Sequence, residues 1–177
     1  MSHIIFITGG ARSGKSTFAE KRAAESGSPL GYLATAQSLD SEMDQRVTLH
    51  RERRGDEWHT IEEPIFLAEE LARCDGQYQA ILVDCVTLWL SNLLFKYEAA
   101  GEKCEKRIHE ELLRLIDTVQ EMVTPVILVS NEVGMGIVPD NALSRMFRDI
   151  AGTANQTLAA AADEVHVVIS GIPLKLK

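Results

Sequence analysis

Residues 9–16 carry the strongest chemical signal in the sequence. They read Gly-Gly-Ala-Arg-Ser-Gly-Lys-Ser and match the phosphate-loop pattern G-x-x-x-x-G-K-S/T at every defined position. The glycines let the backbone curl, so that successive N–H groups face a polyphosphate. Lys15 would then reach the β- and γ-phosphates, and Ser16 would be a ligand of Mg²⁺. The nucleotide-binding residues expected here are Gly9, Gly10, Ala11, Arg12, Ser13, Gly14, Lys15 and Ser16.

The segments on either side of this loop support the same interpretation. Residues 4–8 are β-branched and aromatic, as in a strand buried on both faces, and residues 17–26 read as a helix. A chance glycine-rich turn is the alternative, but it does not account for a strand before the loop and a helix after it. We therefore expect a site that binds a nucleoside triphosphate.

A phosphate loop needs a carboxylate on the opposite side of its metal ion. Residues 79–84 form an apolar strand that ends in Asp84, as expected of the Walker B aspartate. Asp84 and Ser16 are thus the predicted Mg²⁺ ligands.

Residues 29–35 read as a second strand parallel to the first. Open α/β sheets bind ligands at the carboxyl ends of their strands, so Ala34, Thr35 and Ala36 could approach the nucleotide. An ordinary strand-to-helix turn explains the same residues equally well.

A helix is expected over residues 41–54, and His50 lies on it within a basic cluster. Arg51, Arg53 and Arg54 could clamp a polyphosphate, and their charge would keep the imidazole neutral and therefore nucleophilic. The alternative is a solvated helix face with an ordinary surface or packed histidine.

The remaining pattern predicts an α/β fold. Strands are expected at residues 57–62, 125–130 and 164–170 with an edge extension at 172–177, and helices at 64–73, 86–97, 104–123 and 141–162. We predict one domain over residues 1–177, P-loop NTPase-like, with a mostly parallel sheet flanked by helices in a RecA-like arrangement. Glu62 and Glu63 read as N-terminal acids of a helix. Residues 131–139 suit either a flap over a bulky substrate or a plain surface loop.

Composition narrows the class of protein. The formal net charge of -8 and a pI near 5.1 argue against a general nucleic-acid or acidic-membrane surface. The apolar runs are too short to span a bilayer and the N-terminus does not read as a leader, so a cytoplasmic enzyme is expected. Cys74, Cys85 and Cys104 lack metal-site spacing and are expected to be reduced and structural.

Four stretches together resemble one enzyme family. Residues 9–16, 34–43, 131–139 and 147–152 are similar to the bifunctional adenosylcobinamide kinase/adenosylcobinamide-phosphate guanylyltransferase family of adenosylcobalamin biosynthesis. The likeness extends over essentially the whole chain, through residues 158–165 to the tail at 170–172.

This resemblance implies two activities. ATP or GTP would phosphorylate the hydroxyl of the adenosylcobinamide side chain in the presence of Mg²⁺, and GTP would then donate GMP to that phosphate through a guanylyl-histidine at His50. It also implies a homotrimer. Beyond the phosphate loop, the implied nucleotide contacts are Ala34, Thr35, Ala36, Arg51, Glu52, Arg53, Arg54, Glu62 and Asp84. Gly55 stands where many relatives have proline, and Asp84 where some have glutamate.

Three other functions fit parts of the sequence. One is a phosphate-loop kinase of a small metabolite without nucleotidyl transfer. Another is a regulatory GTPase, but the D-x-x-G at residues 149–152 falls in a helical stretch and no N-K-x-D run is present. The third is a nucleotide-sensing module, which nothing in the sequence favours.

Overall fold

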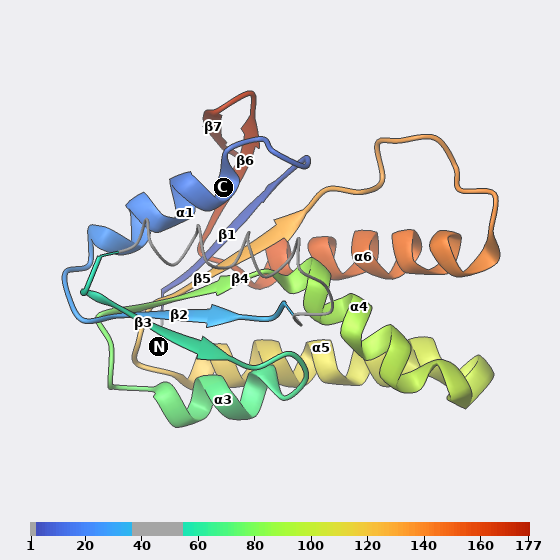
Figure 1. Cartoon of the computed structure of the whole chain (residues 1–177), viewed down its shortest axis with the longest axis horizontal. Coiled ribbons are helices and arrows are strands. Elements are labelled where there is room, and N and C mark those ends of the chain that lie inside the picture. The colour runs from blue at the N-terminus through green and yellow to red at the C-terminus, as the bar shows by residue number, and fades with distance from the viewer. Residues whose placement is uncertain (1–2, 37–54) are drawn as a thin grey trace.

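The computed structural model describes residues 3–36 and 55–177, which form a seven-stranded sheet with helices on both faces (Figure 1). The strands are β1 (Ile4–Gly9), β2 (Leu30–Ala34), β3 (Trp58–Glu62), β4 (Ala80–Asp84), β5 (Val126–Asn131), β6 (Glu164–Ile169) and β7 (Ile172–Lys175). The helices are α1 (Lys15–Ala24), α3 (Leu67–Cys74), α4 (Val86–Tyr97), α5 (Cys104–Glu121) and α6 (Ala142–Ala161), with a 3₁₀ helix, η1 (Glu98–Lys103), before α5. The helix expected over residues 41–54 lies outside the described residues.

The strand order confirms the predicted RecA-like arrangement. It is β3-β2-β4-β5-β1-β6-β7, with β1 to β6 parallel and β7 antiparallel to β6. Strand β5 therefore lies between β1, which leads into the phosphate loop, and β4, which ends at Asp84. The carboxyl ends of all six parallel strands meet at one edge of the sheet, where ligands of such sheets bind.

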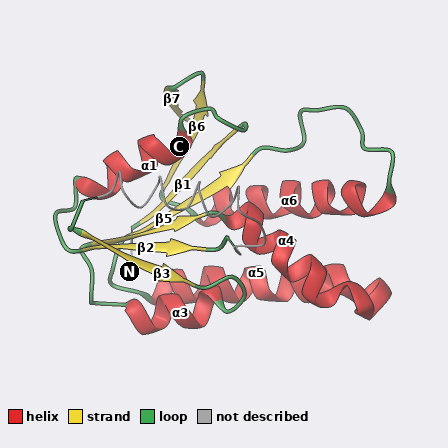
Figure 2. Cartoon of the chain, viewed as in Figure 1, coloured by secondary structure: helices red, strands yellow, loops and turns green. Residues whose placement is uncertain are grey.

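Both faces of the sheet are covered, which explains its continuous apolar strands. Ile4 and Phe6 of β1 pack in the cluster with α3, α4, α5 and α6, whereas Ile5 and Ile7 pack in the cluster with α1. Figure 2 shows these helices on the two sides of the sheet. Each such side chain contributes about 1.5–3 kcal/mol when fully buried. Among the described residues, no helix is long and apolar enough to cross a membrane.

The start of α3 differs from the sequence prediction. The pattern placed it at Pro64, but the helix begins at Leu67. Glu63 Oε1 accepts hydrogen bonds from the backbone N–H groups of Ile65 and Phe66, both at 2.8 Å, and this side-chain turn delays the helix. By contrast, α4 has the predicted bounds, and the three cysteines are buried with free thiols as expected.

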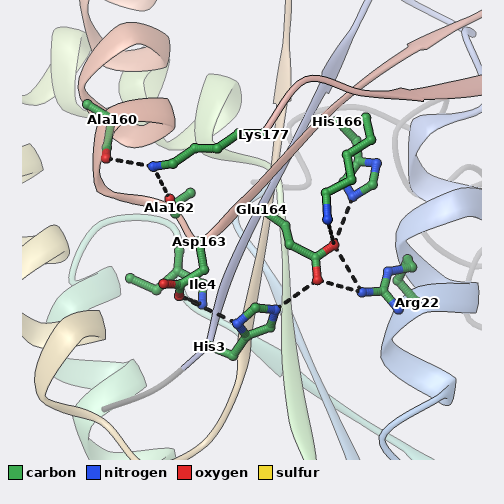
Figure 3. A network of polar contacts seen from close by, with 10 residues as sticks. His3, Ile4, Arg22, Ala160, Ala162, Asp163, Glu164, His166 and Lys177 are labelled. Carbon is green, nitrogen blue, oxygen red and sulfur yellow. Dashed lines mark hydrogen bonds and ion pairs between the residues drawn. The ribbon is translucent and has the colours of Figure 1, made fainter.

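The amino-end edge of the sheet carries a network of polar contacts centred on Glu164 (Figure 3). Its carboxylate accepts hydrogen bonds from His3 Nε2 at 3.0 Å, His166 Nε2 at 3.1 Å and Arg22 Nη2 at 3.3 Å. Lys175 Nζ of β7 lies 3.8 Å away. These contacts, first those from His3 and His166, lower the pKa of Glu164 to about 2. The network joins α1, β6, β7 and the residue before β1.

A second carboxylate at the same edge is also satisfied. Asp75, after α3, accepts backbone N–H hydrogen bonds from Thr124 at 2.9 Å and Val123 at 3.1 Å. Burial raises the pKa of Asp75, but these bonds outweigh it and the pKa falls below its ordinary value. Asp75 thereby fixes the turn that leads into β5.

Candidate active site

The phosphate loop joins β1 to α1 at the carboxyl edge of the sheet. Gly14 is the N-cap residue of α1 and has a φ of 95°, in the left-handed region that favours glycine. This explains why the helix begins at Lys15, two residues before the predicted start. The Lys15 side chain is only 8% exposed, and its Nζ donates to the carbonyl of Gly10 at 3.2 Å. Its ammonium group is therefore held over the loop in which phosphates would bind.

The turn between β6 and β7 supports the phosphate loop from one side. The N–H of Gly171 donates to the carbonyl of Ser13 at 2.8 Å. A Cβ on Gly14 would lie 3.2 Å from Gly171 Cα, and one on Gly9 would lie 2.5 Å from the Val168 carbonyl oxygen. A side chain at position 9 would collide with backbone, and one at position 14 would crowd the Gly171 backbone and be strained by the positive φ. The loop therefore needs glycine for packing as well as for curvature. The family resemblance includes residues 170–172 but gives them no role. The hydrogen bond from Gly171 to Ser13 indicates that they support the phosphate loop.

Two hydroxyl groups near the loop lack partners among the described residues. Ser13 Oγ and Thr8 Oγ1 are buried and make no hydrogen bond within the part of the chain that the structure describes. A buried polar group without a partner costs about 1–3 kcal/mol. Such a cost is typical of a region arranged for binding rather than for stability.

Asp84 lies at the end of β4, two strands from the phosphate loop. Its carboxylate is half-buried and, within the described residues, accepts one hydrogen bond, from Tyr32 Oη to Oδ2 at 3.1 Å. Proteins hold Mg²⁺ through one or two carboxylates together with substrate phosphates. Asp84 and the half-buried Ser16, on the first turn of α1, fit that requirement at this edge. Burial, reinforced by Asp84, raises the pKa of the neighbouring Cys85 thiol to about 11, so the thiol is neutral.

Thr35 is fully buried, and its polar groups already have partners. Its hydroxyl accepts from the N–H of Cys85 at 2.9 Å and donates to the Cys85 carbonyl at 2.7 Å. The Thr35 carbonyl accepts from Asn92 Nδ2 at 2.8 Å. The side chain therefore fastens the end of β2 to the residue after Asp84. A direct nucleotide contact by Ala34, Thr35 and Ala36 stays a prediction. Of the three, Ala36 is partly accessible, whereas Ala34 and Thr35 are buried.

The remaining predicted contacts are divided between the sheet edge and the undescribed segment. Glu62 ends β3 at the carboxyl edge and is exposed, whereas Glu63 caps the turn before α3. His50, Arg51, Glu52, Arg53 and Arg54 lie outside the described residues, so their roles stay predictions.

Sequence reasoning missed a buried polar network at the end of β5. Thr87 Oγ1 accepts from the N–H of Asn131 at 2.6 Å and shares a hydrogen bond of 3.1 Å with Ser130 Oγ. Ser130 Oγ donates to Asn155 Oδ1 at 2.7 Å, and Asn155 Nδ2 donates to the Asn131 carbonyl at 3.2 Å. The network fixes Asn131, which pairs with Gly9 in register. The signal that could have found this network is the polar pair Ser130-Asn131 at the end of an otherwise apolar strand.

Two other features lie apart from the predicted site. A cavity of about 350 Å³ between α4, α5 and α6 has no predicted site residue in its lining. Asp149 to Gly152 lie inside α6, as the sequence indicated, so the D-x-x-G run does not form a GTPase loop.

The fold and the site define a P-loop NTPase, with the phosphate loop on β1, the acidic residue on β4 and one strand between them. The crystal structure of the RadB recombinase has a similar fold, with a TM-score of 0.53 at 16% sequence identity; the match covers 93% of this chain and 73% of that one. The chain belongs to the cobinamide kinase / cobinamide phosphate guanyltransferase family, whose model matches residues 5–176.

Curated relatives support this assignment over nearly the whole chain. The bifunctional adenosylcobalamin biosynthesis protein CobU of Escherichia coli is 45% identical, with 98% of this chain and 99% of the relative covered. CobP of Pseudomonas aeruginosa is 44% identical, with 97% and 95% covered. CobU of Salmonella typhimurium is 44% identical, with 98% and 99% covered. The Pseudomonas and Salmonella relatives are also described as bifunctional adenosylcobalamin biosynthesis proteins.

Proposed function

We propose that this protein phosphorylates the side-chain hydroxyl of adenosylcobinamide with a nucleoside triphosphate and then transfers GMP from GTP to the new phosphate. The observation that carries the proposal is the convergence of the phosphate loop and Asp84 at one sheet edge in a member of this family.

In the kinase step, the chain's task is to position and neutralise the γ-phosphoryl group during in-line transfer. The loop N–H groups and Lys15 would contact the phosphates. When bound, Mg²⁺ held by Ser16 and Asp84 would offset the charge of the β- and γ-phosphate oxygens. Thr35 would keep the residue after Asp84 in place through its two hydrogen bonds to Cys85.

The second step requires a nucleophile that the kinase step does not use. His50 would attack the α-phosphate of GTP and expel pyrophosphate, and the cobinamide phosphate would then displace His50 and take the GMP. Arg51, Arg53 and Arg54 would stabilise charge on the phosphates. The proposal includes a homotrimer, implied by the resemblance, and a cytoplasmic location.

Intact-protein mass spectrometry after incubation with GTP and Mg²⁺ tests this function, comparing the wild type with His50→Ala. We expect a GMP adduct on the wild type alone, while His50→Ala still phosphorylates adenosylcobinamide. An adduct on both proteins would remove His50 from the mechanism. No adduct on a wild type that is an active kinase would instead indicate a simple metabolite kinase.

A further inference from the structure

Glu132 lies beside the phosphate loop, although no sequence pattern assigned it a role. It follows Asn131, the last residue of β5, and its backbone N–H donates to the carbonyl of Gly9 at 3.0 Å. This hydrogen bond joins the start of the phosphate loop to the residue after β5. Because β5 separates β1 from β4, Glu132 emerges between the loop and Asp84.

Among the described residues, a backbone N–H group and not a cation orients the carboxylate of Glu132. The side chain is half-buried, and Oε1 accepts from the N–H of Gly134 at 2.7 Å. A Cβ on Gly134 would lie 2.9 Å from this oxygen, so glycine leaves room for the carboxylate. Within residues 3–36 and 55–177, no lysine or arginine forms an ion pair with Glu132.

The backbone that carries Glu132 is rigidly held. Thr87 and Asn155 bind the N–H and the carbonyl of Asn131, the preceding residue, from α4 and α6. Three neighbouring backbone groups, two on Asn131 and one on Glu132, thus have fixed partners. A side chain on such a support can act at a defined place beside the reacting phosphate.

A carboxylate without a cationic partner among the described residues, next to a triphosphate site, is electrostatically unfavourable, so its presence calls for a chemical use. Transfer of a phosphoryl group to an alcohol releases the hydroxyl proton, which needs an acceptor. Asp84 fits the metal, and Glu63 is hydrogen bonded to the turn before α3, away from the phosphate loop. Glu132 is the carboxylate that adjoins the phosphate loop within the described residues. Its hydrogen bond there, from the N–H of Gly134, uses Oε1 and leaves Oε2 to accept a proton.

We propose that Glu132 orients the substrate hydroxyl and accepts its proton in the kinase step; this inference rests on the proposed function. The hydroxyl oxygen forms a bond to the γ-phosphorus, and the bond from that phosphorus to the β–γ bridging oxygen breaks. The nucleoside diphosphate leaves with the electron pair. The hydroxyl proton passes to the Glu132 carboxylate and from there to solvent.

Measuring the kinase step and GMP transfer separately distinguishes a proton-accepting role of Glu132 from a structural one. Glu132→Gln keeps the size and the acceptor oxygen for Gly134 but cannot take a proton. We expect its kcat for phosphorylation of adenosylcobinamide to fall about 100-fold or more, with little change in KM. GMP transfer to chemically prepared adenosylcobinamide phosphate should be retained, because that acceptor carries no hydroxyl proton to remove. Glu132→Asp should recover part of the kinase rate.

Asp140→Asn is the matched control, because it removes one exposed negative charge from the same loop. It should leave both half-reactions unchanged. Equal loss of both half-reactions in Glu132→Gln, or loss of neither, would overturn the role of Glu132 while leaving the proposed function in place. A wild type without kinase activity would overturn the proposed function and this inference with it.

The pH profile of kcat gives a second readout that a structural role would not move. If Glu132 accepts the proton, the decrease of the wild-type kinase rate at acid pH should be absent or much reduced in Glu132→Gln. An unchanged acid limb in that variant would contradict the proposal.

Discussion

Polar side chains at the two edges of the sheet differ in the partners that they have among the described residues. At the amino-end edge, Glu164 contacts two cations, Arg22 and Lys175, and two histidines, and Asp75 accepts backbone N–H groups from the turn before β5. At the carboxyl edge, Asp84 and Glu132 have no cationic partner within the described residues, and Ser13 Oγ is buried without a hydrogen bond.

This difference separates stability from function. Paired carboxylates lower the free energy of the folded chain, whereas unpaired polar groups raise it and are retained where a ligand uses them. Substitutions at the carboxyl edge should therefore change activity more than stability. Those at the amino edge should do the reverse.

Lys15→Ala should give the largest effect. Loss of the ammonium group that we predict to contact the phosphates is expected to lower kcat/KM of the kinase step by about 10³-fold. The melting temperature should change little, because the buried charge loses one hydrogen bond to a neutral carbonyl but also its desolvation cost. A coupled kinase assay measures kcat/KM, and a thermal melt measures the melting temperature. Lys21→Ala, on the exposed side of α1, is the control and should retain activity. A large fall in the melting temperature of Lys15→Ala would contradict the contrast between the two edges.

Glu164→Gln should produce the converse result. A pKa lowered from 4.5 to about 2 corresponds to about 3 kcal/mol of stabilisation of the folded state. The Glu164 side chain is 19% exposed, and screening by solvent reduces this stabilisation to about 1–2 kcal/mol. Because the folded-state pKa is depressed, this stabilisation is present above pH 4.5 and is lost as the pH falls through about 2. Urea unfolding at pH 7 and pH 3 should therefore show a smaller difference from wild type at the lower pH, with normal kinase kinetics at pH 7. A constant difference at both pH values would be inconsistent with charge pairing.

Thr87→Val should give the smallest effect and should affect both properties. The isosteric change leaves the N–H of Asn131 without its acceptor, which costs about 1 kcal/mol of unfolding free energy. The displaced end of β5 should also lower the kinase kcat by about tenfold. Thr87→Ser should restore both, and Thr118→Val, which removes only a hydroxyl bonded within α5, should change neither. Denaturant melts and steady-state kinetics test this. Lower stability with a normal kcat would assign the network to the folded scaffold alone.

The sequence predicted the parts of the site that local pattern encodes. Residues 9–16 match a motif whose spacing is fixed by the geometry of phosphate binding, and continuous apolar runs located β1, β4 and β5 because both sheet faces are buried. Thr87, Ser130 and Asn155 escaped notice because they come together only when α4 and α6 pack over β5.

Two of the partners of Glu164 escaped prediction for the same reason. His3 and Arg22 are more than 140 residues away in the chain, and no spacing rule links such distant positions. The late start of α3 had a local cause, the Glu63 side chain, but that cause depends on which backbone groups the carboxylate reaches. Patterns therefore identify strands and motifs, whereas hydrogen bonds between distant segments require the folded chain.

The hydrogen bond between Gly171 and Ser13 has a consequence for synthesis of the chain. Residues 9–16 leave the ribosome early, but β1 pairs on both sides with strands from the later part of the chain, and the turn that supports the loop is made near its end. Domains emerge N-terminus first, at about 5–20 residues per second. The supporting turn is therefore synthesised about 8–30 s after the phosphate loop. A nascent chain that stops before residue 171 should not form a complete nucleotide site.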